Sequence, residues 1–204
     1  TLLEGALAGS RSLFASYHAL PAARPEHEGA FVALWEGSIP WRRRPLERYR
    51  ARGDDPWGER LLRTQLLQEL PYTIAFGVAP ENTALAALVN VNPAQGEFTA
   101  HSVEFSLEEE GVDFLEFAVR TLPGAAPQKE RHWFGLWPGI PERYDPSRSL
   151  GRRFLDQNQN MFRTSLLDLD LEFSRQYTAA YGVSEAWSAV AATVTFTSGG
   201  YEAS

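Results

Sequence analysis

The chain contains no cysteine, and this absence excludes disulfide bridges, thiolate metal sites and cysteine nucleophiles together. Long apolar runs are also missing, because stretches such as Ala84 to Val89 fall far short of the roughly 20 residues that a helix needs to cross a bilayer. No signal peptide is evident at the start. The sequence itself therefore predicts no membrane span.

Lysine is nearly absent, since Lys129 is the single lysine beside the arginines. The formal net charge of -7 argues against general nucleic-acid binding, which needs a basic surface to neutralise phosphates. The one basic cluster runs from Trp41 to Arg44 and continues through Arg48, Arg50 and Arg52. A charge run of this kind is typical of a solvated face, and we interpret it so.

Motifs that carry catalysis are missing as well. The sequence has no G-x-S-x-G, no G-x-x-x-x-G-K-[ST] and no G-x-G-x-x-G pattern. Its four histidines never form an H-x-x-x-H pair that one helical face could present to a metal. We therefore predict no enzyme, and no catalytic, cofactor-binding or metal-binding residue. Calcium binding by Asp168, Asp170 and Glu172 is the alternative that carboxylate oxygens leave open.

Two segments predict helices. From Leu2 to Leu20 the chain is rich in alanine and leucine, and Pro21 ends the segment. Asp55 and Pro56 resemble a second helix start, and the apolar stripe that follows ends at Pro71. The stretch between them, rich in proline, reads as a connector with a possible short helix at residues 29–36.

Alternating patterns then predict strands at residues 72–78, 84–91, 103–107, 112–119, 166–173 and 190–197. In the segment 166–173 leucines and Phe173 occupy one face and acidic residues the other, and in 190–197 Val194 and Phe196 oppose threonines. Glu108 to Gly111 reads as a hairpin tip, and the aromatics of 131–144 lie in a long loop. No repeat of fixed period is evident.

These elements predict an α+β fold with one or two N-terminal helices packed on an antiparallel sheet. We expect residues 1–56 to form the N-terminal helix and proline-rich connector, and residues 57–204 to form the globular domain. Burial of the inward Leu, Phe and Val side chains would be the main stabilising contribution.

The helix Arg60 to Leu70, the turn Phe154 to Asp156, the strand Leu166 to Phe173 and Trp187 leading into Val190 together resemble the minor pseudopilins of type II secretion. The J-type subunit is the nearest in pattern, and the minor pilins of type IV pili are related. Thr1-Leu-Leu-Glu4 is similar to the start of mature pilin-like chains. The aromatic residue that usually leads such chains and the apolar span that usually follows are missing here.

This resemblance implies a pilin-like fold and a non-catalytic subunit that helps assemble a secretion pseudopilus or a type IV pilus tip. It implies other minor pilin-like subunits as partners, a periplasmic location at the inner membrane and a native N-terminal anchor ahead of these residues. The helical stripe would contact those partners through Leu13, Phe14, Tyr17 and Leu20. The alternative is a soluble acidic interaction module, such as an immunity or adaptor protein, which would bind a basic partner.

Overall fold

The computed structural model describes residues 1–7, 12–67 and 69–199, and it describes Arg42 without its side chain. These residues form strands and two short 3-10 helices, and no α-helix occurs among them. The first half contains β1 (Leu2–Leu7), β2 (Leu13–His18), β3 (Phe31–Glu36), η1 (Pro40–Arg42), β4 (Glu47–Arg50), β5 (Trp57–Leu62), β6 (Tyr72–Gly77), β7 (Leu85–Asn92) and β8 (Glu97–Ser102). The second half contains β9 (Glu104–Glu110), β10 (Leu115–Arg120), β11 (Trp133–Pro138), η2 (Pro146–Arg148), β12 (Gly151–Phe154), β13 (Met161–Leu166), β14 (Gln176–Gly182) and β15 (Val190–Thr197).

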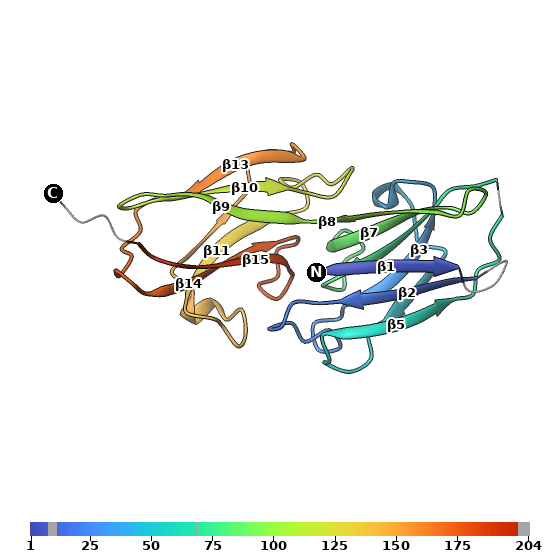
Figure 1. Ribbon diagram of the computed structural model, residues 1–204, viewed down its shortest axis with the longest axis horizontal. Coiled ribbons are helices and arrows are strands. Elements are labelled where there is room, and N and C mark those ends of the chain that lie inside the picture. Colours follow the sequence, from blue (N-terminus) through green and yellow to red (C-terminus); the bar gives the residue numbers. More distant parts are fainter. Residues whose placement is uncertain (8–11, 68, 200–204) are drawn as a thin grey trace.

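The strands build two β-sandwiches that lie end to end (Figure 1). In the first, the sheet β1-β2-β5 faces the sheet β4-β3-β6-β7-β8. In the second, the sheet β13-β10-β9 faces the sheet β12-β11-β14-β15. All of the pairings are antiparallel, and apart from β8 the two strand orders are the same.

The second half of the chain repeats the first. Leu13 corresponds to Leu115, an offset of 102 residues, and both begin a stretch that ends in Leu-Pro. Tyr-Thr-Ile-Ala-Phe-Gly-Val from Tyr72 corresponds to Tyr-Thr-Ala-Ala-Tyr-Gly-Val from Tyr177, an offset of 105 residues. The sequence has no repeat of fixed period, as the two offsets differ, but the chain is an internal duplication of one sandwich.

Each sandwich has a tyrosine at the start of its sixth strand that fastens the preceding loop. The Tyr72 hydroxyl accepts a hydrogen bond from the Leu67 N–H at 2.9 Å, and the Tyr177 hydroxyl accepts one from the Glu172 N–H at 2.8 Å. A tyrosine that bonds to backbone just upstream of this strand is the tyrosine corner of immunoglobulin-like sandwiches. Strand order and corner together identify both halves as immunoglobulin-like.

The core of each sandwich is formed by side chains that point inward from both sheets. Tyr17 of β2 stacks on Phe76 of β6, with ring centroids 4.4 Å apart. In the second half Phe105 of β9 stacks on Phe117 of β10 at 4.9 Å and also contacts Tyr181 of β14. Because apolar burial contributes about 25 cal/mol per Å², these aromatic layers are a main source of stability.

The predicted α+β fold is wrong, because the described residues of the segments 2–20, 29–36 and 57–70, where helices were expected, contain no α-helix. Residues 2–7 and 13–18 form the paired strands β1 and β2, residues 31–36 form β3, and Trp57–Leu62 of the last segment forms β5. Residues 8–11 and 68 of these expected helices lie outside the described residues. The boundary expected at residue 56 falls between β4 and β5 of one sandwich. Pairing across the sheet outweighs local helix propensity in all three segments.

The strand expected at 166–173 is also wrong. The strand β13 ends at Leu166, opposite Leu115, where its partner β10 begins, so no neighbouring strand remains for the following residues. Asp168 then adopts a positive φ of 59°, which ends the extended conformation. Leu169 and Leu171 still pack on the core, but Phe173 is 68% exposed.

Several predicted strands are confirmed, namely 72–78 as β6, 84–91 as β7, 103–107 within β9, 112–119 as β10 and 190–197 as β15. Burial alternates in the second half of this strand, where Val194 and Phe196 are half-buried while Thr195 and Thr197 are exposed, whereas Val190, Ala191 and Ala192 are all buried. The hairpin between β9 and β10 is confirmed too, but its tip is Gly111 to Phe114, and Glu108 to Glu110 belong to β9. The long loop expected from Pro123 to Asn160 contains β11 and β12.

One extended segment joins the two sandwiches. Only Val103 separates β8, the edge strand of the first sandwich, from β9, the first strand of the second, and the two follow each other in one line in Figure 1. The sandwiches also contact each other directly, because Trp41 Nε1 donates a hydrogen bond to the Pro123 carbonyl at 2.7 Å. Leu20 packs against the aromatic cluster around Trp133 and Trp137 in the second sandwich.

Candidate functional site: an arginine-lined groove

A strongly charged cavity lies on the first sandwich, where the edges of its two sheets face each other. Among the described residues β4 pairs only with β3 and β5 only with β2, so each presents one edge without a neighbouring strand there. Between these edges opens a groove of about 770 Å³. It is lined by Glu26, Arg48, Tyr49, Arg50, Ala51, Arg52, Arg60, Leu61 and Arg63.

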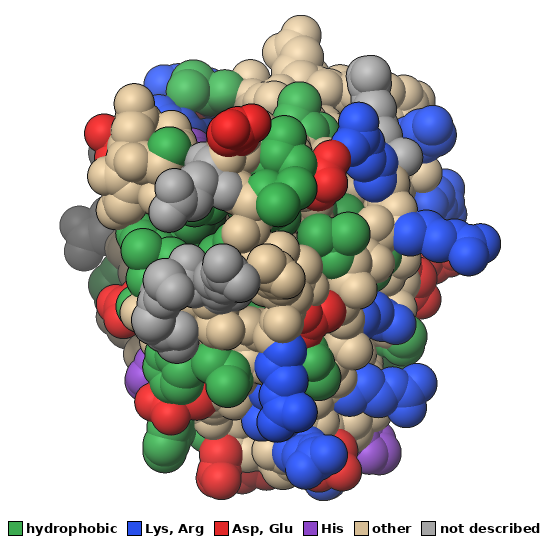
Figure 2. All heavy atoms as spheres, turned by 90° about the vertical axis from the view of Figure 1, so that its right-hand side faces the viewer, with side chains coloured by type: hydrophobic (Ala, Val, Ile, Leu, Met, Phe, Trp, Pro, Cys, Tyr) green, Lys and Arg blue, Asp and Glu red, His purple; other side chains and the backbone are tan. Residues whose placement is uncertain are grey.

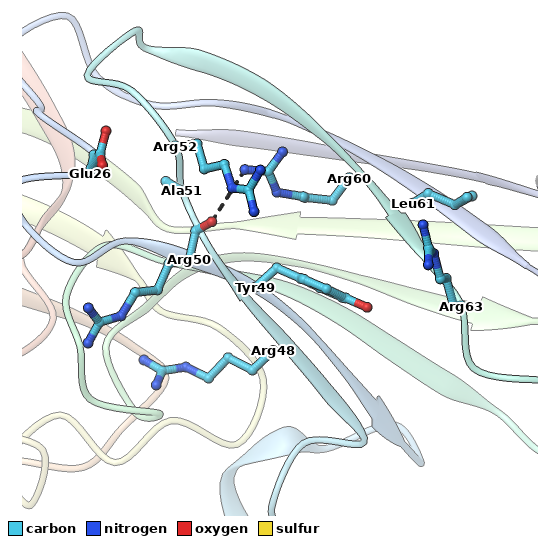
Figure 3. Close-up of a pocket in the computed structure, with 9 residues that line it drawn as sticks. All are labelled: Glu26, Arg48, Tyr49, Arg50, Ala51, Arg52, Arg60, Leu61 and Arg63. Atoms are coloured by element: carbon cyan, nitrogen blue, oxygen red, sulfur yellow. Dashed lines mark hydrogen bonds between the residues drawn. The ribbon is translucent and has the colours of Figure 1, made fainter.

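The arginines reach the groove from both strands, from the loop that joins them and, in the case of Arg63, from just after β5 (Figure 3). Arg52 and Arg60 lie beside each other, and Arg60 Nη2 donates a hydrogen bond to the Arg50 carbonyl at 3.3 Å. Arg48 and Arg50 extend together on the other side of β4, as strand residues two apart do. Arg63 lies beyond the Tyr49 ring.

Within the described parts of the chain, none of these five guanidinium groups lies within 4.0 Å of a carboxylate. The nearby Glu47 is engaged otherwise, because it accepts hydrogen bonds from the Tyr49 hydroxyl at 2.7 Å, the Arg63 N–H at 3.0 Å and the Thr64 hydroxyl. Burial acts to raise the pKa of Glu47, but these donors outweigh it and hold the pKa below its usual value.

The positive charges also act on one another. Burial lowers the pKa of Arg48, and the neighbouring Arg50 charge lowers it further. Arg48 is held by its stacking over the Phe31 ring, 4.0 Å from the ring centroid, and by a hydrogen bond to the Pro80 carbonyl. An arginine always carries its charge, so the groove is a fixed positive site. Figure 2, viewed from the end of the first sandwich, shows basic side chains gathered along one side.

Three acidic side chains on β9 and β10, by contrast, are paired with arginines. Arg163 lies 3.0 Å from Glu116 and 3.6 Å from Glu108, and Arg120 lies 3.4 Å from Glu104. These pairs neutralise part of the negative charge on β9 and β10.

The residues expected to contact pilin-like partners lie in or next to β2. Leu13 and Tyr17 are buried in the core of their own sandwich, with exposures of 0% and 2%. Phe14 is half-buried on the opposite face of the strand, and Leu20, beyond its end, packs on the second sandwich. These side chains therefore do not form one helical stripe.

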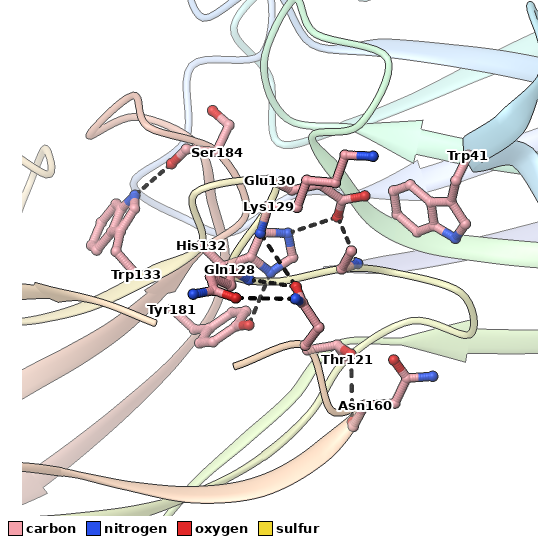
Figure 4. A network of polar contacts seen from close by, with 12 residues as sticks. Trp41, Thr121, Gln128, Lys129, Glu130, His132, Trp133, Asn160, Tyr181 and Ser184 are labelled. Atoms are coloured by element: carbon pink, nitrogen blue, oxygen red, sulfur yellow. Dashed lines mark hydrogen bonds and ion pairs between the residues drawn. The ribbon is translucent and has the colours of Figure 1, made fainter. Parts of the chain in front are cut away.

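A buried polar cluster occupies the second sandwich near the junction (Figure 4). His132, 1% exposed, has its Nδ1 2.9 Å from the Tyr181 hydroxyl and its Nε2 3.2 Å from a Glu130 oxygen. Glu130 also accepts a hydrogen bond from the Ala126 N–H at 3.1 Å, and burial raises the pKa of Tyr181 well above its usual value. The contacts of Glu130 and His132 hold the loop between β10 and β11 against itself and against β14.

In the described residues, no group of three or more His, Asp or Glu side chains gathers as a metal site would require. Asp168 and Asp170 lie in the loop after β13, and Glu172 pairs with Arg175. No helix among these residues is long and apolar enough to cross a membrane.

No known protein-family model matches the chain, and no curated protein matches it. Solved structures of tandem fibronectin type III domains do match. The FN1-FN3 domains of chicken CNTN1 align with a TM-score of 0.34 and 14% identity, covering 97% of this chain and 66% of that one. The central fibronectin-III array of RIM-binding protein aligns with a TM-score of 0.28 and 9% identity, covering 98% of this chain and 68% of that one. The chain thus spans about two thirds of their lengths.

The resemblance to minor pseudopilins is wrong, because the described residues contain no α-helix and build two sandwiches. The pilus-assembly function and the pilin-like fold, which that resemblance implied, are therefore wrong as well. Pilin-like partners and a periplasmic location were derived from that resemblance alone and stay untested.

Proposed function

We propose that the protein is a non-catalytic binding module that holds an anionic partner in the groove between β4 and β5. The observation that carries this proposal is the set of five arginines that line one groove, none of them within 4.0 Å of a carboxylate among the described residues. On a chain with a net charge of -7, such a cluster concentrates positive potential at one place. Planar guanidinium groups suit carboxylate, sulfate or phosphate groups, which accept two hydrogen bonds at once.

The groove offers charge and hydrogen-bond donors but little that transfers protons. Its one carboxylate, Glu26, already accepts a hydrogen bond from the Gly53 N–H at 2.6 Å. No histidine lines it. Binding without chemistry is therefore the function that this arrangement supports best.

Arg52 and Arg60 provide the test, because they lie beside each other in the groove. We expect the protein to bind poly-L-glutamate or heparin, with an affinity that falls as salt rises. Changing both residues to glutamine removes two charge-assisted contacts and should weaken binding roughly tenfold. Titration of fluorescently labelled polymer at two or more salt concentrations measures both effects.

The matched control is the double variant Arg120→Gln and Arg163→Gln, which removes the same charge from arginines that are paired with glutamates on the second sandwich. It should bind as the unchanged protein does. Equal weakening by both double variants would show a nonspecific charge effect and would contradict a site in the groove. If the unchanged protein bound neither poly-L-glutamate nor heparin, the proposal would be contradicted as well.

A further inference from the structure

The two sandwiches meet through pairs of equivalent contacts. The Val103 N–H donates to the Ala86 carbonyl at 3.2 Å, and the Thr1 nitrogen donates to the Ala191 carbonyl at 3.4 Å. Thr1 precedes Leu2–Leu7 as Val103 precedes Glu104–Glu110, and Ala86 and Ala191 are equivalent positions of β7 and β15. The residue that leads into each sandwich is thus bonded to the seventh strand of the other repeat.

A second pair of contacts shows the same reciprocity. Leu20 follows β2 in the first sandwich and packs on the cluster that contains Trp133 and Trp137 of β11 in the second, and Tyr144 of the loop after β11 packs on the same cluster. Trp41, in the loop after β3, donates to Pro123, which follows β10 in the second sandwich. In both cases the loop after the second strand of one repeat meets the third strand of the other repeat or the loop that follows it. The repeats are therefore related by an approximate two-fold axis.

This symmetry fails at one place. The segment that leads into Val103 is β8, which pairs with β7 in the register Leu88↔His101, Asn90↔Thr99 and Asn92↔Glu97. The equivalent edge belongs to β15, at Thr193, Thr195 and Thr197. In the described residues no strand pairs with this edge.

The edge of β15 suits a partner strand. Thr195 and Thr197 are exposed, and threonine favours extended backbone. The strand carries no lysine and no proline, the residues that commonly protect an edge from pairing. Its first rung is already formed, because Thr1 bonds to Ala191.

We propose that the edge of β15 accepts an extended segment of the polypeptide that is continuous with Thr1. By the register of β8 on β7, the segment runs antiparallel to β15. The residue two positions before Thr1 then lies opposite Thr193, the one four positions before it opposite Thr195, and the one six positions before it opposite Thr197. Each of these rungs exchanges two backbone hydrogen bonds. The proposal is independent of the arginine groove, which lies between β4 and β5.

The test joins a copy of β8, with the sequence Glu-Phe-Thr-Ala-His-Ser, directly to the amino end of Thr1. Amide hydrogen exchange, measured by NMR, then reports on the N–H groups of Thr193, Thr195 and Thr197. We expect their exchange to slow by about tenfold or more, because a paired N–H exchanges only on opening. The amides of β7 serve as the internal reference.

Two altered leaders make the test specific. Proline in place of the copied Thr99 and His101 removes donors that face β15, and this leader should give no protection. Proline in place of the copied Ala100, whose N–H points away from β15, should leave most of the protection of the β15 amides.

Unchanged exchange with the unaltered leader would overturn the proposal. Equal behaviour of the two proline leaders would overturn it too, because the pairing would not follow the register. The free hexapeptide is the third arm: protection by it at equimolar concentration would show that the edge takes strands from any source and needs no connection to Thr1.

Discussion

Glu28 is the residue whose ionisation bears most directly on the junction. It lies in the loop after β2, and burial raises its pKa to about 7, aided by the Asp54 charge and opposed by a backbone hydrogen bond at Arg24. Its charge also reaches across to the second sandwich, where burial chiefly, and Glu28 in addition, raises the pKa of Tyr144 to about 12. A carboxyl with a raised pKa favours the fold in its protonated form.

The sign of the pH effect follows from linkage. Because the folded pKa lies above the usual 4.5, the folded state binds more protons than the unfolded state between these values. The contribution of Glu28 to stability is therefore complete below pH 4.5 and is lost as the pH rises through about 7. Glu28→Gln should flatten the fall of Tm between pH 5 and 8 that the unchanged protein shows, as measured by calorimetry.

The control is Glu69→Gln, which changes an exposed carboxyl in the loop before β6. It should keep the pH dependence of the unchanged protein. A Glu28→Gln protein whose Tm depends on pH as steeply as the control would contradict the role of this carboxyl.

At the scale of the element, glycines at two equivalent bulges leave room for the aromatic rings of Phe31 and Trp133. Gly77 of β6 lies under the Phe31 ring and Gly182 of β14 lies under the Trp133 ring, and an added Cβ at either position would collide with the ring. Both follow a register shift in their sheets. The Trp133 ring cannot move aside easily, since it is fully buried and its Nε1 donates to the Ser184 carbonyl at 2.7 Å.

We therefore expect Gly182→Ala to lower the free energy of unfolding by about 1–3 kcal/mol, the range typical of overpacked cores. Gly151→Ala on β12 is the control, because an added Cβ there meets no atom within 4 Å. Urea denaturation compares the two. Equal stability of both variants would show that the sheet shifts to admit the methyl group.

Strands with two-residue alternation were predictable at this scale. Other strands were expected to be helices, and this error has a definite physical reason. Positions four apart, such as Leu13 and Tyr17, share a face in a helix and also in a strand, so their spacing fits both. The strand β3 is buried on both faces, and a short apolar run of that kind does not distinguish the two structures. The partner strand decides, and local sequence does not contain it.

Part of the candidate site could be recognised from the sequence. Arg48, Arg50 and Arg52 were recognised as a basic run, but Arg60 and Arg63 belong to a segment expected to be a helix. Only the packing of two sheets brings β4 and β5 together, so the groove could not be inferred from the run alone. Arg48, Arg50 and Arg52 are exposed, and the cavity that they line together with Arg60 and Arg63 makes them a candidate site.

For the whole molecule, the duplication of one sandwich is present in the sequence but does not stand out as a periodic pattern. The offset between equivalent residues drifts from 102 at Leu13 and Leu115 to 105 at Tyr72 and Tyr177, so no fixed period exists to be detected. What persists is confined to constrained positions, such as the corner tyrosines and the glycines at the bulges. Equivalent loops differ in length, since loops tolerate insertion.

Because the two sandwiches share buried contacts, we expect a single cooperative thermal transition. Changing Leu20 and Trp41 together to alanine removes the packing on the Trp133 cluster and the hydrogen bond to Pro123. The double variant should resolve into two transitions in calorimetry, one for each sandwich. Leu67→Ala with Leu150→Ala, which changes exposed leucines of both halves, is the control. Two transitions in the unchanged protein would contradict the coupling.

The segment from β8 through Val103 to β9 gives the molecule a mechanical character. It is bonded to β7 on one side of Val103 and to β10 on the other. A tensile load that draws the sandwiches apart along this line acts on both ladders in shear, so their bonds resist together and do not open one at a time. The protein is thereby built to transmit force between its halves as a stiff tie.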